Sequence, residues 1–360
     1  MKFDPEAPYN ELPFIPLSID VETPAVLRQA ARSHAVLGKL NGYCGTLPNA
    51  GLLVDSLIVQ ESRSSSAIEN IVTTQDEIYR AMATHGPLEP AAKEVVDYRA
   101  ALWQGHELLK ERGGITVNSL LQIQETLTHT NAGVRALPGT VLKHEGTGAT
   151  IYTPPVGRER ILGLLGNLET YMGSADGVDP LVKMAVIHHQ FESIHPFYDG
   201  NGRTGRILNI LFLVKSSLLD LPVLYLSREI IRRKSDYYRL LQSVRTEDAW
   251  EEWVLFMLQA VEVTSITTLR LITAIRDLLE KTIDLCRSRL PRTSYSKELV
   301  ERLFVQPYVK TEHLVKAGIA ERRTATKYLR QLEDLGVLDS FKAWRETIFV
   351  NRGLYNLLKE

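Results

Sequence analysis

The chain has 360 residues, enough for two or three folded units with substantial hydrophobic cores. With 44% hydrophobic and 24% charged residues it has the composition of a globular protein, and its net charge of −1 excludes a global electrostatic attraction to nucleic acid or to a membrane surface. Cys44 and Cys286 have no metal-binding spacing and suit a reducing compartment. The amino terminus lacks an apolar signal region and no apolar run approaches a membrane span, so we expect a cytoplasmic protein with no membrane partner.

Residues 1–110 are predicted to form an N-terminal helical region behind an extended arm. The arm, residues 1–24, contains five prolines and little periodicity. Beyond it, apolar residues recur with helical spacing in the ranges 24–40, 52–60, 76–84 and 89–112.

The segment from Ser65 to Asn70, with the sequence SSAIEN, permits two interpretations. In the structural one, Ser66 is the N-cap of a helix and Glu69 reaches back to it, which is a capping box. In the functional one, Ser65, Glu69 and Asn70 form a motif that acts on another part of the chain. The choice between them depends on the residues downstream.

Residues 111–265 are predicted to form a helical domain interrupted by one β-hairpin. Helical patterns cover 117–128 and 159–173, and the β-prone runs 140–144 and 149–153 flank a glycine-containing turn. A lone hairpin in a helical domain has a free edge with which an incoming strand can pair. The alternative is an ordinary surface hairpin.

The most informative stretch lies between two apolar helical segments, 181–191 and 207–219, and reads HPFYDGNGRTGR from His195 to Arg206. Its glycines allow several N–H groups to turn inward, and the second helix starts near Gly202 with free N–H groups that favour an anion. Arg203 and Arg206 lie three residues apart and share one helix face. These features together predict a polyphosphate site.

Two further groups in this stretch fit the same chemistry. Asp199 supplies an oxygen ligand for a hard cation, and His195 titrates near neutrality as a general base should. The alternative is a helix–turn–helix joint in which Asp199 and Asn201 cap the second helix and the arginines are solvated. His188 and His189, which precede the stretch, lack metal-ligand partners at a suitable spacing, so we interpret them as structural or surface residues.

The stretch from His195 to Arg206 closely resembles the signature of the Fic (Fido) family, whose members transfer AMP from ATP to a hydroxyl side chain of a protein. The resemblance implies a mainly α fold, with a Fic-type helical bundle and a β-hairpin flap. It also implies a protein adenylyltransferase that uses ATP and Mg²⁺. In-line attack of a Ser, Thr or Tyr hydroxyl on the α-phosphate is the implied reaction.

The resemblance also implies a role for each site residue. His195 takes the proton from the attacking hydroxyl, Phe197 anchors the loop, and Asp199 binds Mg²⁺. Arg203 holds the β-phosphate, Arg206 holds the γ-phosphate, and Asn201 contacts the α-phosphate. The implied nucleotide-binding residues are Gly200, Asn201, Gly202, Arg203, Thr204, Gly205 and Arg206, with Tyr237 and Tyr238 against the adenine.

Ser65-x-x-x-Glu69-Asn70 resembles the inhibitory motif of Fic proteins, which favours the functional interpretation of that segment. The resemblance implies that Glu69 forms a bidentate pair with Arg206, replaces the γ-phosphate there, and leaves bound ATP misaligned. Some family members use this glutamate to remove AMP, and that alternative stays open.

The partners follow from the same resemblance. It implies a target protein that docks a hydroxyl-bearing segment on the flap at 140–153. Modification of the chain itself and a homodimer are open alternatives.

Residues 266–290 are predicted to be a connecting helix, and residues 291–360 resemble a winged helix-turn-helix. The latter has three helical patterns, two β-prone runs, and 13 Lys and Arg against 9 Asp and Glu, a net charge of +4. DNA binding through 291–360 competes with protein docking or dimerisation. The alternative function is a DNA-binding regulator whose central domain only senses nucleotide, although a sensor does not need a general base such as His195.

Overall fold

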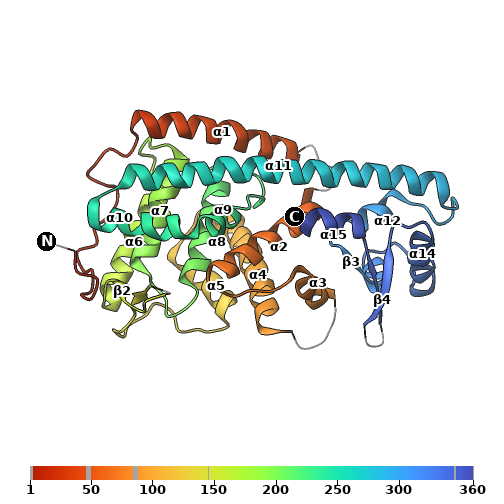
Figure 1. Cartoon of the computed structure of the whole chain (residues 1–360), viewed down its shortest axis with the longest axis horizontal. Helices are drawn as coiled ribbons and strands as arrows, with labels where there is room; N and C mark the ends of the chain where they lie inside the picture. Colours follow the sequence, from red (N-terminus) through yellow and green to blue (C-terminus); the bar gives the residue numbers. More distant parts are fainter. Residues whose placement is uncertain (1–2, 46–49, 84–87, 145, 344–345, 360) are drawn as a thin grey trace.

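The structure is a computed structural model that describes residues 3–45, 50–83, 88–144, 146–343 and 346–359. It is mainly helical, as predicted. The longest element is α11 (Trp250–Arg289), a helix of 40 residues, and α1 (Pro24–Gly45) packs along it. In Figure 1 this pair lies along one side of the molecule, with a helical bundle beneath one end of α11 and a smaller unit beneath the other.

The bundle contains the helices that position the candidate site. They are α2 (Ala50–Ile68), α3 (Gln75–Ala83), α4 (Pro90–Arg112), α5 (Val117–Thr128), α6 (Arg158–Gly173), α7 (Pro180–Ile194), α8 (Asn201–Lys215), α9 (Ser227–Arg232) and α10 (Lys234–Glu247). α8 packs against α7, α4 and α5, and α2 packs against α4 and α9. α9 and α10 are separate helices because the backbone leaves the helical region at Arg233.

The innermost helix of the bundle is α7. Asp179 caps its amino end by accepting hydrogen bonds from Leu181 N at 2.8 Å and Val182 N at 3.4 Å. Every residue from Leu181 to Ile194 is buried, the polar and charged ones included. His188 and His189 are therefore structural core residues, the first of the two alternatives expected from the sequence.

α2 corrects the capping-box interpretation of Ser66. The helix continues through the serine-rich stretch to Ile68, so Ser66 lies inside it and cannot be an N-cap. Asn70 adopts a left-handed backbone conformation with φ 62°, which ends the helix. Glu69 is thereby placed at the carboxyl end of α2, free to reach another element.

The carboxyl-terminal unit consists of α12 (Lys297–Arg302), β3 (Tyr308–Val309), α13 (Thr311–Lys316), α14 (Arg322–Asp334), β4 (Asp339–Ala343), β5 (Glu346–Val350) and α15 (Arg352–Lys359). Its antiparallel sheet has the strand order β3-β5-β4. The sequence did not predict β3 or α15, because two and eight residues are too short for a clear periodic signal. The winged helix-turn-helix interpretation of this unit stays a prediction.

α3 joins the bundle to this unit directly after the segment that carries Glu69. Gln75 Nε2 donates to the Leu358 carbonyl at 2.8 Å, and the Arg80 guanidinium lies 5.0 Å from the centre of the Phe341 ring. The Tyr308 hydroxyl hydrogen-bonds Asp76. Glu69 thus lies between two packed helices, α2 before it in the chain and α3 after it.

The predicted hairpin is present but short, with β1 (Leu142–Lys143) paired to β2 (Thr150–Tyr152). Glu145 of its turn lies outside the described residues. The extended arm supports the hairpin base, since Tyr9 N donates to the Thr153 carbonyl at 2.9 Å and the Phe3 ring stacks on Tyr152. Among the described strands, β1 and β2 pair only with each other, so an outer edge stays open.

α11 is long and apolar enough, by length and composition, to cross a membrane. Half of its most apolar window is buried inside the fold, as in the core helix of a folded domain.

A pair of glycine substitutions tests the close packing of α4 against α5 and α8. A Cβ at Gly105 would lie 2.6 Å from Leu211 Cδ1 and 2.9 Å from Ile123 Cδ1, whereas one at the exposed Gly38 of α1 meets nothing within 4 Å. We expect Gly105→Ala to lower the free energy of unfolding by about 1–3 kcal/mol through overpacking, and Gly38→Ala to raise it by about 0.5–1 kcal/mol through helix propensity. Urea unfolding followed by circular dichroism measures both, and effects of the same sign would contradict the packing described.

Candidate active site

The loop between α7 and α8 is held by its own side chains. Asn201 Oδ1 accepts from Phe197 N and Asn201 Nδ2 donates to the Phe197 carbonyl, both at 2.8 Å. The Phe197 side chain is fully buried, as expected of a loop anchor. The amide oxygen and one of the two Nδ2 hydrogens of Asn201 are thus used within the loop, which leaves the second Nδ2 hydrogen and the backbone N–H for the predicted phosphate contact.

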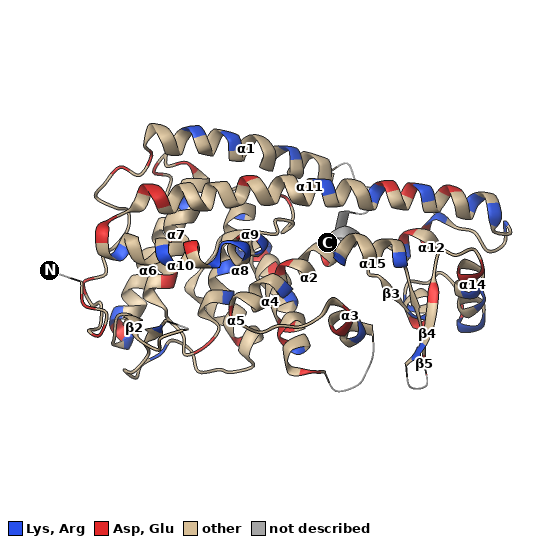
Figure 2. Cartoon of the chain, in the orientation of Figure 1, with Lys and Arg blue, Asp and Glu red and all other residues tan. Residues whose placement is uncertain are grey.

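The amino end of α8 offers an anion site. Gly200, the N-cap of α8, has φ 78°, a left-handed conformation that favours glycine, and without a side chain it cannot cap the helix. The first intrahelical bond at this end runs from Thr204 N to the Gly200 carbonyl, so the three preceding N–H groups of the helix lack intrahelical acceptors. Figure 2 shows the basic residues of α8 in the middle of the bundle.

Arg206 lies almost fully buried beside this end of the helix, and Glu69 lies next to it. The guanidinium Nη2 contacts Glu69 Oε1 at 2.8 Å. The contact is single rather than the bidentate pair that we expected, because Arg206 Nε donates to Ser65 Oγ at 2.8 Å and Nη2 also donates to the Ser65 carbonyl at 3.0 Å.

The Glu69 carboxylate also lies against the backbone of the anion site. A side chain at position 202 would collide with Glu69 Oε1, so the carboxylate covers Gly202 in the first turn of α8. Burial alone would raise the pKa of Glu69, but the charges of Arg206 and Arg203 and the hydrogen bond from Arg206 lower it below its ordinary value. Glu69 is therefore ionised at neutral pH.

Arg203 has a carboxylate partner that the sequence did not reveal. Its Nη1 hydrogen-bonds Glu94 of α4, and its Nη2 lies 3.4 Å from both carboxylate oxygens of Asp199. The Arg203 side chain is 4% exposed and that of Glu94 is 33% exposed. Both arginines at the anion site thus have glutamate partners from other helices.

His195 ends α7 in a left-handed conformation with φ 47°. Its Nδ1 is enclosed and has no hydrogen-bond partner. Burial, followed by the positive charge of Arg135, lowers the pKa of His195 to about 4. The imidazole is therefore neutral at pH 7, the form that accepts a proton.

Asp199 is the residue that fits a divalent cation. Its side chain is 74% exposed to solvent. Oδ1 accepts a hydrogen bond from Gly200 N at 2.7 Å, and Oδ2 lies 3.4 Å from Arg203 Nη2. One carboxylate completed by phosphate oxygens and water is the donor set that Mg²⁺ takes at nucleotides. The described residues contain no cluster of three or more His, Cys, Asp or Glu that could hold a metal without the nucleotide.

The two tyrosines expected at the adenine, Tyr237 and Tyr238, differ in how deeply they are buried. Tyr237 is 1% exposed, and its hydroxyl lies 2.8 Å from His188 Nε2 within an aromatic cluster that includes Trp253. That burial makes Tyr237 a core residue rather than an exposed platform for a base. Tyr238 is partly exposed, and its ring contacts Tyr237 edge-on at 5.1 Å.

Two other buried charged groups near the site were missed by the sequence analysis. Arg135 is 1% exposed and donates hydrogen bonds to backbone carbonyls beside His195. Glu192 is buried behind Gly205, and burial raises its pKa to about 7. A charged residue within an apolar-rich helical segment is a sequence signal that could have identified Glu192, whereas Arg135 lies in a loop and gives no such signal.

Three family models match the chain in succession. The Fic/DOC family N-terminal model matches residues 27–107, the Fic/DOC family model matches 114–213, and the model described as protein adenylyltransferase SoFic-like, C-terminal domain, matches 278–354.

Curated relatives and solved structures agree with these models. Protein adenylyltransferase fic-1 of Caenorhabditis briggsae is 31% identical over 98 residues, and a probable protein adenylyltransferase of Aquifex aeolicus is 40% identical over 57 residues. These alignments cover 26% and 16% of this chain and 18% of each relative, so the chain matches less than a fifth of their length.

Among solved structures, a Fic family protein from Desulfovibrio desulfuricans has a TM-score of 0.55 at 20% identity, covering 93% of this chain and 97% of that one. Fic-1 of C. elegans has a TM-score of 0.53 at 19% identity, covering 67% and 71%. These structures share the fold, and with the three consecutive family models they show that the chain belongs to the Fic/DOC (Fido) family.

Proposed function

We propose that the protein is a self-inhibited adenylyltransferase that moves AMP from ATP to a Ser, Thr or Tyr hydroxyl of a target protein. The observation that carries the proposal is a neutral imidazole at the end of α7, beside a helix amino terminus that bears two buried arginines. The family membership and the relatives named protein adenylyltransferases support the choice of reaction.

The proposed reaction uses each group in one role. The acceptor hydroxyl attacks the α-phosphorus of ATP, the new O–P bond forms, and the bond to the leaving pyrophosphate breaks. His195 accepts the proton of the hydroxyl, and the α8 amino end with Arg203 and Arg206 stabilises the negative charge of the phosphates. A Mg²⁺ ion bound through Asp199 would add further charge neutralisation at the phosphates.

In the proposed resting state, two carboxylates occupy the two arginines that the phosphates need. Glu69 contacts Arg206 and covers Gly202, while Glu94 contacts Arg203. ATP must displace or share these partners, and its anionic tail is repelled by both. Release of Glu69 would let the γ-phosphate take its place on Arg206.

We propose the open edge of the β1–β2 hairpin as the docking surface for the target, by strand addition. The hairpin lies beside the His195 loop, since the Tyr152 hydroxyl of β2 donates to the Ser193 carbonyl at 2.7 Å. An extended segment paired there would bring its side chain to the end of α7.

A DNA-binding regulator is the second candidate, favoured by the exposed Arg322, Arg323 and Lys327 on α14. Arg330 on the same helix is instead bonded to Glu333 and Ser340. We rank the enzyme first because nucleotide sensing does not need the neutral imidazole of His195.

We expect Glu69→Gly to raise AMP transfer by at least about tenfold, because the γ-phosphate no longer competes with a charged hydrogen bond to Arg206. Incorporation of label from α-labelled ATP, into the protein itself or into a lysate, measures the effect. His195→Ala in the same background serves as the inactive control. Equal labelling by the parent and Glu69→Gly would remove Glu69 from the mechanism, and no labelling by any variant would refute the enzyme.

We expect Glu94→Gln, made in the Glu69→Gly background, to tighten ATP binding by roughly three- to tenfold, since Arg203 gains a free charge for the β-phosphate. Calorimetric titration with a non-hydrolysable ATP analogue measures the affinity. Glu111→Gln, an exposed change on the same helix, is the matched control. Weaker binding by Glu94→Gln would instead mean that Glu94 holds Arg203 in its productive orientation.

We expect Asp199→Ala to lose at least about 100-fold in AMP transfer and to abolish the dependence on Mg²⁺, because the cation loses the carboxylate proposed to bind it. A Mg²⁺ titration of transfer in the Glu69→Gly background measures both. An Asp199→Ala protein that retains the parent's Mg²⁺ response would place the metal elsewhere.

A further inference from the structure

Arg135 connects three segments around His195, and no part of the proposed function has assigned it a task. It lies between α5 and β1, and its side chain is 1% exposed. Nε donates to the His195 carbonyl at 2.7 Å, and Nη2 donates to the carbonyls of Ile194 at 3.1 Å and Pro155 at 2.6 Å. Its backbone N–H donates to the Pro196 carbonyl at 2.9 Å.

The placement of this charge is unusual. A buried guanidinium is costly unless it is paired, and within the part of the chain that the structure describes no carboxylate forms an ion pair with Arg135. The acceptors are instead backbone carbonyls, and those at the end of α7 lie where the helix dipole favours a cation. Arg135 thus caps α7 from a distant segment.

Its hydrogen bonds fix the backbone on both sides of His195. The Ile194 carbonyl belongs to the peptide before His195, and the His195 carbonyl belongs to the peptide after it. One guanidinium therefore holds both peptide planes that define the left-handed conformation of His195, φ 47°. That conformation costs an ordinary residue about 1–2 kcal/mol and persists only where the surroundings enforce it.

The third acceptor extends this control to the hairpin. Pro155 follows β2 by three residues, at the base of the open-edged hairpin. The same guanidinium thereby bonds the peptide that carries the imidazole and the chain that leads from the hairpin. The distance between the proton acceptor and the surface proposed for the incoming hydroxyl depends on this side chain.

We propose that Arg135 is a positioning residue for AMP transfer, which fixes the His195 backbone against the hairpin base so that the imidazole faces the incoming hydroxyl. The inference rests on the proposed function. The positive charge of Arg135 has a second effect, because it disfavours protonation of the nearby His195 imidazole. The charged groups that act on His195 are Arg135 and Arg245, which lower its pKa, and Glu69, which raises it.

The test uses the full chain in the Glu69→Gly background, with Arg135→Met and Arg135→Lys. We expect Arg135→Met to lower kcat by about 30- to 100-fold with KM for ATP changed by less than about threefold, because the phosphate contacts are untouched while the base is misplaced. Arg135→Lys keeps the charge but cannot donate in the same plane to three carbonyls, so we expect a loss of kcat with little change in pH dependence.

The pH profile separates positioning from mere structural support. Removal of the positive charge raises the pKa of His195, so in Arg135→Met the acidic limb of kcat moves to higher pH, and activity falls more at pH 6 than at pH 8. NMR titration of the imidazole in the same variant should show the same upward shift. This measurement does not need turnover, so it still tests Arg135 if the proposed transfer reaction fails.

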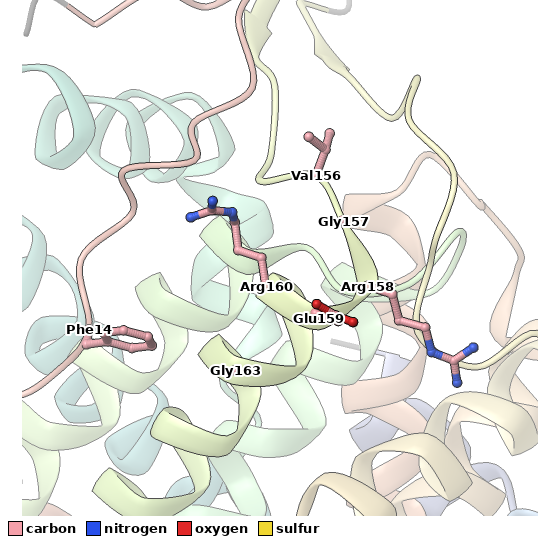
Figure 3. A pocket seen from close by; sticks show the side chains of 7 residues that line it. All are labelled: Phe14, Val156, Gly157, Arg158, Glu159, Arg160 and Gly163. Carbon is pink, nitrogen blue, oxygen red and sulfur yellow. The ribbon is translucent and has the colours of Figure 1, made fainter.

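Arg160 provides the matched control. It is another arginine that donates to a backbone carbonyl, that of Asn10 at 2.8 Å, in the surface groove between the arm and the start of α6 shown in Figure 3. Arg160→Met should leave kcat and the His195 titration at parent values. A folded Arg135→Met with parent kcat and an unshifted imidazole titration, or an Arg135→Lys variant with full kcat, would overturn the proposal.

Discussion

Two arginines buried at the amino end of α8 require negatively charged groups around them, and the rest of the site depends on that requirement. Arg203 and Arg206 are 3% and 2% exposed, and burial of a guanidinium is favourable only when negative charge and acceptors surround it. Without a nucleotide, that charge comes from α4 through Glu94 and from the end of α2 through Glu69. If the proposed function holds, the packing of α2 and α4 around α8 would therefore depend on whether a nucleotide occupies the site.

The same constraint explains why the resting pairing can be both stable and reversible. The two glutamates are partly exposed, whereas the arginines are not, so the carboxylates can leave toward solvent while the cations stay in place. A polyphosphate offers the same charge and more acceptor atoms than the two carboxylates together. In the proposed mechanism, the bundle would thus keep a fixed cationic centre and exchange its anionic partners.

Local patterns in the sequence predicted most of the helices and the position of the loop between α7 and α8, while the chemistry of that loop stays a prediction. The helix over 117–128 has its predicted bounds, and the glycine-rich joint between two buried helices lies where the signature placed it. The capping-box reading of Ser66 failed because Ser-x-x-Glu describes the start of one helix and the end of another equally well until the tertiary partner of Glu69 is known. The burial of Tyr237 could not be read from the sequence, because an aromatic pair has the same spacing whether it faces a ligand or the core.

The remaining site residues could not be predicted because their partners are distant in sequence. Glu94 meets Arg203 across 109 positions, and Arg135 meets the His195 carbonyl across 60. Neither residue stands out within its own segment, since a glutamate on a helix and an arginine in a loop are ordinary surface choices. Only the assembled fold shows that both are directed inward.

The length of α11 has a consequence for any partner that contacts both ends of the protein. At 1.5 Å per residue its 40 residues form a rod of about 60 Å, with the hairpin near one end and α14 near the other in Figure 1. A small substrate cannot span that rod. A molecule held by the carboxyl-terminal unit and modified at the bundle would itself have to be extended or large, so the length of α11 would limit which partners can contact both ends.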